Sequence, residues 1–148
     1  MTTSTPPRYI LDTNILVSYL RGRTLGQWIE ATYRLSTSPV TPLISVVTEG
    51  ELWSLAWQFS WGDEKKRQLQ LILRNFVAIQ LDQPGVIEAY AEIDSFSIQN
   101  GRRMGKNDVW IAAAARYSGT MLLTTDKDFD HLDPQFITRC YIDPNSHL

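Results

Sequence analysis

Short apolar runs alternate with stretches of helical periodicity along most of this 148-residue chain. The alternation predicts a parallel sheet covered by helices, because a chain that leaves one strand and enters a second parallel strand must cross a face of the sheet. The expected strands are Tyr9–Leu11, Leu43–Val47, Phe76–Leu81, Met121–Thr125 and the edge-like Arg139–Ile142. The predicted fold is therefore of the α/β class, a three-layer α/β/α sandwich with a mainly parallel central sheet.

Helical spacing of apolar residues fills the intervals between these runs. The expected helices cover a segment containing Ile15 to Leu20, then Gln27–Leu35, Thr48–Trp61, Asp63–Arg74, Pro84–Gln99 and a helix from Asn107 or Asp108 through Ala115. A chain of this length is the size of one domain. We expect residues 1–7 to form a flexible tail and residues 8–148 to form a single domain.

Composition limits the classes of protein that this chain can belong to. A single cysteine, Cys140, excludes an intrachain disulfide and favours a cytoplasmic location. With only two histidines, a zinc site of the His/Cys kind has almost no ligands available. No apolar run approaches the ~20 residues that span a bilayer, so no membrane association is expected, and the polar N-terminus lacks the apolar core of a signal peptide.

Four acidic residues stand near points where an apolar run gives way to a turn or a helix. They are Asp12, Glu51, Asp108 and Asp126. Each has a structural explanation of its own. Asp12 and Asp126 suit turns or helix caps, Asp108 suits the positive end of a helix, and Glu51 completes a capping box that starts at Thr48.

Taken together, these acids favour a shared site. Ligands of parallel sheets bind beyond the carboxyl ends of the strands, and four carboxylates gathered there would repel one another without a cation. Carboxylate oxygens select hard ions, so Mg²⁺ is expected and Mn²⁺ is possible. The net charge of −2 becomes positive once these four acids are set aside, which is compatible with a phosphate-backbone substrate.

Four segments around these acids resemble, in order and spacing, the signature segments of PIN-domain ribonucleases. They are Ile10–Leu16, Glu51-Leu52, Asn107–Ala115 and Leu123–Phe129. The match covers nearly the whole chain and is most similar to the VapC-type toxins of toxin–antitoxin pairs. One departure is visible in Trp53–Trp57, where the family often has a small residue; it concerns the partner surface more than the chemistry.

The resemblance implies Mg²⁺- or Mn²⁺-dependent cleavage of RNA by a homodimer that a small antitoxin protein inhibits. It places Asp12, Glu51, Asp108 and Asp126 at the family's catalytic acidic positions. We expect Asp12, Asp108 and Asp126 to bind metal, which would lower the pKa of a coordinated water and neutralise charge on the phosphodiester. One ion or two ions are both compatible with the sequence, and Glu51 could hold the water or a second ion.

Further candidates flank the acids. Asn14 and Thr125 could orient carboxylates or waters, with a turn and an ordinary strand position as the alternatives. Arg102, Arg103 and Lys106 precede Asp108 in a Gly-bounded loop and could bind RNA phosphates, with a solvated loop as the alternative.

The helix expected after Thr48 carries two apolar faces. Leu52, Leu55, Ala56 and Phe59 form one face, and Trp53, Trp57 and Trp61 form the other. The first face suits the sheet. The tryptophans suit a partner helix or a second subunit, or else plain core packing.

Two other functions stay open. A different Mg²⁺ enzyme, such as a phosphohydrolase or a phospho-accepting receiver domain, also places Asp at strand ends, but Asp12-Thr13-Asn14 lacks the second Asp that such phosphohydrolases typically use. A non-catalytic binding module with the same fold is the third possibility, and the retention of four mutually repelling acids argues against it.

Overall fold

The computed structural model describes residues 7–146, which form one five-stranded parallel sheet between two layers of helices. The strands are β1 (Tyr9–Leu11), β2 (Leu43–Ser45), β3 (Val77–Ile79), β4 (Met121–Thr124) and β5 (Arg139–Tyr141). Their order across the sheet is β3-β2-β1-β4-β5, and every pairing is parallel. Residues 1–6 of the predicted N-terminal tail lie outside the described residues, so the division into a tail and a domain stays a prediction.

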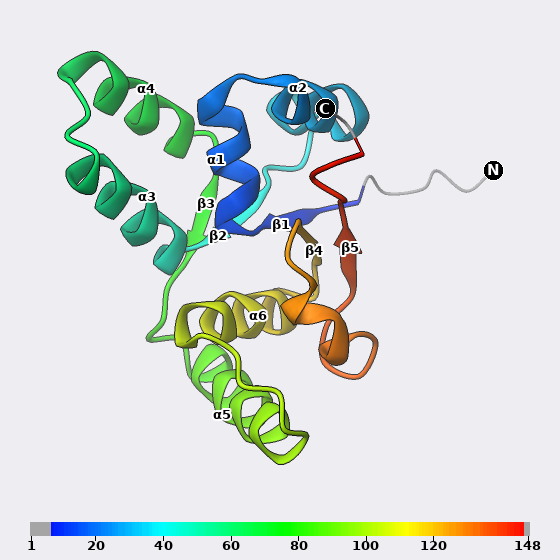
Figure 1. The fold of residues 1–148 in the computed structure, drawn as a ribbon. Helices are drawn as coiled ribbons and strands as arrows, with labels where there is room; N and C mark the ends of the chain where they lie inside the picture. Colours follow the sequence, from blue (N-terminus) through cyan, green and yellow to red (C-terminus); the bar gives the residue numbers. More distant parts are fainter. Residues whose placement is uncertain (1–6, 147–148) are drawn as a thin grey trace.

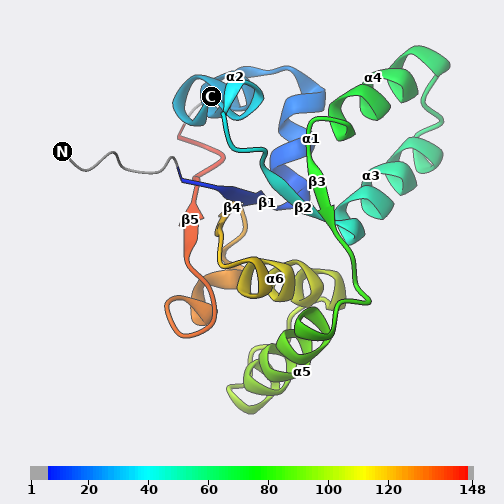
Figure 2. The ribbon, with the colours of Figure 1, turned by 180° about the vertical axis from the view of Figure 1, so that it is seen from behind.

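Helices cover both faces of the sheet, as Figures 1 and 2 show. The upper layer in Figure 1 holds α1 (Thr13–Arg21), α2 (Thr24–Tyr33), α3 (Val46–Gln58) and α4 (Asp63–Leu73). The lower layer holds α5 (Pro84–Gln99) and α6 (Lys106–Ser118). Short 3₁₀ helices follow α2 at Leu35–Thr37 (η1) and follow β4 at Lys127–Leu132 (η2). The predicted three-layer α/β/α sandwich is confirmed.

Adjacent residues of each central strand enter opposite cores. In β1, Ile10 packs against α5, α6 and η2, whereas Leu11 packs among α1 to α4. Leu122 and Leu123 of β4 divide in the same way. Side chains of successive strand residues point to opposite faces of a sheet, so a strand covered on both faces is apolar throughout. This explains why the sequence segments that form β1 and β4 are continuously apolar up to Leu11 and Leu123.

The strand order reverses direction at β1 and β4, which are neighbours in the middle of the sheet. From β1 the chain proceeds outward through β2 to β3, and it then returns to β4 on the other side of β1. After β1 the chain enters α1 in one layer, and after β4 it enters η2 in the other layer (Figure 1). Connections that leave neighbouring strands toward opposite faces open a crevice at the carboxyl ends of these two strands. Asp12 directly follows β1, and Asp126 follows β4 by two residues.

The structure corrects the sequence prediction around β2 and α3. The strand ends at Ser45 and not at Val47, and Ser45 caps α3 by accepting a hydrogen bond from the Val47 amide at 3.1 Å. The β-branched pair Val46-Val47 favours strand by its high β propensity, but both residues belong to α3. The proposed capping box from Thr48 to Glu51 is consequently wrong, because both residues lie inside the helix.

The other end of α3 also differs from its prediction. The helix ends at Gln58 and not at Trp61, and Ser60 takes a left-handed conformation with φ of 51°. Trp61 is therefore not part of a helical tryptophan face. Smaller differences at element ends include a later start and earlier end of β3, and an earlier start of α2 and α6.

Among residues 7–146, no helix combines the length and the apolar character that a membrane span requires.

Candidate active site

Asp12 anchors the site at the end of β1. It is the N-cap of α1, and its side chain is only 3% exposed. Oδ1 accepts a hydrogen bond from the Thr13 amide at 2.7 Å, and Oδ2 accepts one from the Thr124 hydroxyl at 2.7 Å. Capping therefore holds this carboxylate in one orientation while each oxygen keeps further lone-pair capacity.

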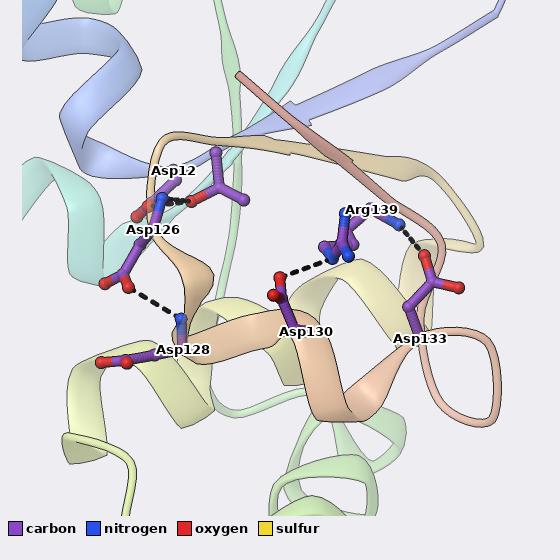
Figure 3. A network of polar contacts seen from close by, with 7 residues as sticks. Asp12, Asp126, Asp128, Asp130, Asp133 and Arg139 are labelled. Carbon is purple, nitrogen blue, oxygen red and sulfur yellow. Dashed lines mark hydrogen bonds and ion pairs between the residues drawn. The ribbon is translucent and has the colours of Figure 1, made fainter. Parts of the chain in front are cut away.

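Thr124 connects the ends of β1 and β4. Its hydroxyl donates to Asp12 and accepts a hydrogen bond from the Asp126 amide at 2.9 Å. The Asp126 carboxylate in turn accepts a hydrogen bond from the Asp128 amide at 2.8 Å and so caps the start of η2. Figure 3 shows this run of contacts from Asp12 to Asp128. Three acidic residues are thus placed by one short network of hydrogen bonds.

Glu51 enters the same site from the second turn of α3. Its Oε1 accepts a hydrogen bond from the Thr13 hydroxyl at 2.7 Å. The Thr13 hydroxyl also lies 3.0 Å from the hydroxyl of Thr48. Since the single Thr13 hydroxyl proton goes to Glu51, Thr48 is the donor to Thr13. Glu51 is therefore oriented by α1 and not by a cap on its own helix.

Asp108 comes from the first turn of α6, on the opposite side of the sheet from α3. One carboxylate oxygen each from Asp108, Asp126 and Asp128 lie within 4.8 Å of one another. Asp108 and Asp126 are partly buried and Asp128 is exposed. This spacing lets the three carboxylates bind one cation, and their donor set consists only of oxygen.

Burial and mutual repulsion make two of these acids hard to ionise. Burial raises the pKa of Asp12 from 3.8 to about 6, against hydrogen bonds from Thr124 and Thr13 that lower it. Burial also raises the pKa of Asp108 to about 7, with further contributions from the negative charges of Asp12 and Asp126. Positive charge placed among these carboxylates would relieve this cost, so the residues fit a divalent cation.

A groove of about 650 Å³ opens above the acids between α1, α3 and the start of α6. Its polar lining includes Asp12, Asn14, Glu51, Ser54 and Asp108. Three of the four predicted catalytic acids therefore face one open space. Asp126 joins them through its proximity to Asp108.

Arg139 of β5 holds η2 beside the site. Its Nε pairs with Oδ1 of Asp130 at 2.9 Å, and its amide donates to Asp133 at 2.8 Å (Figure 3). These contacts hold the middle and the C-terminal end of η2, the segment that carries Asp128, against the edge strand β5. The position of Asp128 consequently depends on β5 as well as on β4.

Of the two residues expected to orient carboxylates or waters, Asn14 lies at the groove and Thr125 makes no such contact among the described residues. Asn14 is exposed and lines the groove. Within the described part of the chain, the Thr125 side chain makes no hydrogen bond, and the neighbouring Thr124 makes the contacts expected of it. Sequence reasoning also missed Asp128 and Thr13. The spacing of Asp126 and Asp128, both polar residues just past a strand, was the available signal for Asp128.

The predicted phosphate-binding cations lie outside the lining of the groove. Arg102 and Arg103 are exposed, and Lys106 Nζ pairs with Asp94 Oδ1 at 2.9 Å. Their role in RNA binding stays a prediction.

The chain is similar in sequence to curated proteins that are named as ribonucleases. The chain is 25% identical over 126 residues to ribonuclease VapC2 of Haemophilus influenzae, covering 84% of this chain and 92% of that protein. It is 26% identical over 132 residues to ribonuclease VapC5 of Mycobacterium tuberculosis, covering 88% and 91%.

Solved structures share the fold. The VapBC2 structure from Rickettsia felis, bound to a promoter DNA fragment, superposes with a TM-score of 0.76 at 21% identity and covers 91% of this chain and 98% of that chain. VapBC-1 from nontypeable Haemophilus influenzae gives 0.73 at 24% identity, with coverage of 90% and 96%. The sequence profile of the PIN domain matches residues 9–134, which includes all four predicted acids. The chain belongs to the PIN domain family.

Proposed function

We propose that this protein is a divalent-metal-dependent ribonuclease and the toxin of a toxin–antitoxin pair. The observation that carries the proposal is the convergence of carboxylate oxygens of Asp108, Asp126 and Asp128 within 4.8 Å. Asp108 also lines the open groove together with the buried Asp12. The curated relatives are ribonucleases by name, and they match over most of their length.

Asp12, Asp108 and Asp126 are the proposed metal ligands, and Asp128 is a fourth. A divalent cation held there supplies an activated water and neutralises the charge that develops on the phosphodiester. Thr124 fixes the distance between Asp12 and Asp126. Glu51 keeps one oxygen free of its bond to Thr13 and can accept a proton or a hydrogen bond from the attacking water.

Mg²⁺ is the proposed ion, with Mn²⁺ as an alternative, because carboxylate oxygens suit both. RNA is the proposed substrate. A small antitoxin is the proposed protein partner, since solved structures with this fold include members of toxin–antitoxin systems. A homodimer and a cytoplasmic location remain predictions from the family resemblance and the cysteine content.

The competing functions are less consistent with the site. A phosphohydrolase would need a residue to protonate its leaving group, and Asn14, two positions after Asp12, cannot donate a proton in that way. A binding module without activity would gain stability by losing the buried charge of Asp12 and the repulsion at Asp108.

The test is cleavage of total RNA by the purified chain, with EDTA and with Mg²⁺ restored. We expect cleavage with Mg²⁺, none with EDTA, and no release of phosphate from phosphomonoesters. Phosphatase turnover without RNA cleavage would favour the phosphohydrolase. RNA binding without any turnover would favour the binding module.

A further inference from the structure

A second hollow continues the acidic groove along α3. The groove of about 650 Å³ and this hollow of about 350 Å³ share two lining residues, Val17 of α1 and Leu55 of α3. The two spaces therefore adjoin, with α1 forming one wall and α3 the other. Glu51 marks the acidic end, and Phe59, the C-cap of α3 and roughly 12 Å further along the helix axis, marks the far end.

The charge of the lining changes from one end to the other. The hollow is lined by no acidic residue and by two cations, Arg21 and Lys65. The acidic end suits a metal ion, and the far end suits an anion. A phosphate chain that enters the groove would thus meet positive charge at both ends once a cation is bound.

Aromatic rings accompany these cations. Phe59 and Trp61 line the hollow, and the side chain of Phe59 is 69% exposed. Lys65 Nζ lies 4.1 Å from the centre of the Trp61 ring. Beside them, Trp57 is 74% exposed and has Lys66 Nζ 4.4 Å from its ring centre. Aromatic faces flanked by lysines are the surface that unpaired nucleic-acid bases and their phosphates bind.

We propose that the hollow between α1 and α3 binds an unpaired base of single-stranded RNA, a few nucleotides from the bond that is cut. The base stacks on Phe59, and Lys65 and Arg21 contact the adjoining phosphates. This inference rests on the proposed function, and it adds that the substrate is unpaired on one side of the cleavage point. A base in a duplex is stacked and paired, so it cannot enter the hollow.

A protein helix is the other class of occupant for an apolar hollow. The charge favours RNA, because both ionisable residues of the lining are cations and because the hollow opens directly into the acidic groove. A volume of about 350 Å³ is at the small end of ligand pockets and suits a ring system.

Binding of labelled single-stranded RNA is measured in Asp12→Asn protein, which keeps the RNA intact, with and without Phe59→Ala. Cleavage of the same RNA is measured in the otherwise unchanged chain. We expect Phe59→Ala to weaken binding by about 5- to 150-fold and to raise KM for cleavage, because base stacking on an aromatic ring contributes on that scale. Ile98→Ala, which removes an exposed apolar side chain from α5 in the other layer, should change neither.

A second variant tests the phosphate contact separately from stacking. Lys65→Gln should lower the salt dependence of single-stranded RNA binding by about one phosphate contact. Both side chains lie at the surface, so loss of folding is not expected, and thermal unfolding of each variant checks this.

The outcomes are distinct. If the unaltered chain cleaves RNA, and Phe59→Ala and Lys65→Gln leave affinity, KM and salt dependence unchanged, the inference fails while the proposed function stands. If these variants affect only the binding of a protein partner, the hollow is a protein interface and the inference is wrong. If the unaltered chain neither binds nor cleaves RNA, both proposals fail.

Discussion

The Thr124 hydroxyl donates a hydrogen bond to Oδ2 of Asp12 at 2.7 Å and accepts one from the Asp126 amide at 2.9 Å. One buried hydroxyl thereby sets the separation between two acids that are far apart in sequence and follow neighbouring strands. The arrangement depends on the parallel pairing of β1 with β4, which brings Leu11 opposite Leu123. The metal binding that we propose for these acids would consequently depend on the register of the sheet.

Replacing Thr124 tests this dependence. Thr124→Val keeps the shape of the side chain but removes both hydrogen bonds, so we expect about a 10- to 100-fold loss in Mg²⁺ affinity or cleavage rate. Thr124→Ser keeps the hydroxyl and should keep most of the activity. Mg²⁺ titrations of cleavage measure the effect.

The adjacent threonine supplies the matched control. Thr125→Val changes the same atoms one residue later, where the side chain has no hydrogen bond among residues 7–146, and should leave the Mg²⁺ dependence unchanged. Equal losses from both threonine variants would show that the geometry at Thr124 is not what matters.

Stability of the metal-free protein should fall as the pH rises. The pKa of Asp12 is about 6 in the folded chain against an ordinary value of 3.8, so the folded state holds this proton more tightly than the unfolded state. Below about pH 4 the group is protonated in both states. Between about pH 4 and 7 the unfolding free energy decreases, by up to about 3 kcal/mol from Asp12.

Asp108 acts in the same direction, since its pKa is raised to about 7. Mg²⁺ should therefore stabilise the protein more at pH 8, where the ligands are ionised, than at pH 5. Urea unfolding at several pH values with EDTA or Mg²⁺ measures both effects. A pH dependence between pH 4 and 7 in EDTA that is the same in Asp12→Asn as in the unaltered chain would contradict the raised pKa of Asp12.

The correction at α3 gives a prediction about Glu51 and Ser45. Because Ser45 caps the helix, Ser45→Ala should cost about 1 kcal/mol of stability. Glu51→Gln removes a negative charge but keeps an oxygen that accepts from Thr13, so it should reduce cleavage without lowering stability. Urea unfolding distinguishes the two. Destabilisation by Glu51→Gln and none by Ser45→Ala would restore the capping box.

The loop before α6 can be tested through salt dependence. If Arg102 and Arg103 bind phosphates flanking the cleaved bond, reversing both charges should weaken RNA binding and reduce its salt slope. Lys106 is already paired with Asp94, so Lys106→Gln should have a smaller effect. An unchanged salt slope in the double charge reversal would show that the loop is only solvated.

The sequence predicted the fold and singled out the four acids, whose catalytic roles stay a prediction, but it did not predict the contacts that orient them. Continuously apolar runs such as Leu122-Leu123 indicate strands covered on both faces, and this pattern is local. The partners of Asp12 and Glu51 are not local. Thr124 lies 112 residues from Asp12, and Thr13 lies 38 residues from Glu51, so only the strand pairing and helix packing reveal them.

Element ends were the weak part of the prediction for a related reason. Val46-Val47 favours strand by propensity, and Ser45 overrides it by capping the helix. The sequence did not identify Asp128 as a site residue because its place beside Asp108 and Asp126 depends on how η2 folds. The ion pair between Asp130 of η2 and Arg139 of β5 helps to hold η2 there, and this contact is not local in sequence.

The most direct test of the metal-dependent ribonuclease account is RNA cleavage by Asp12→Asn beside Asp82→Asn, which removes the same charge from an exposed acid outside the groove lining. We predict that Asp12→Asn abolishes cleavage while the metal-free fold stays as stable or becomes more stable, and that Asp82→Asn cleaves normally. Cleavage by Asp12→Asn at the rate of the unaltered chain, in a preparation free of contaminating nuclease, would contradict the account.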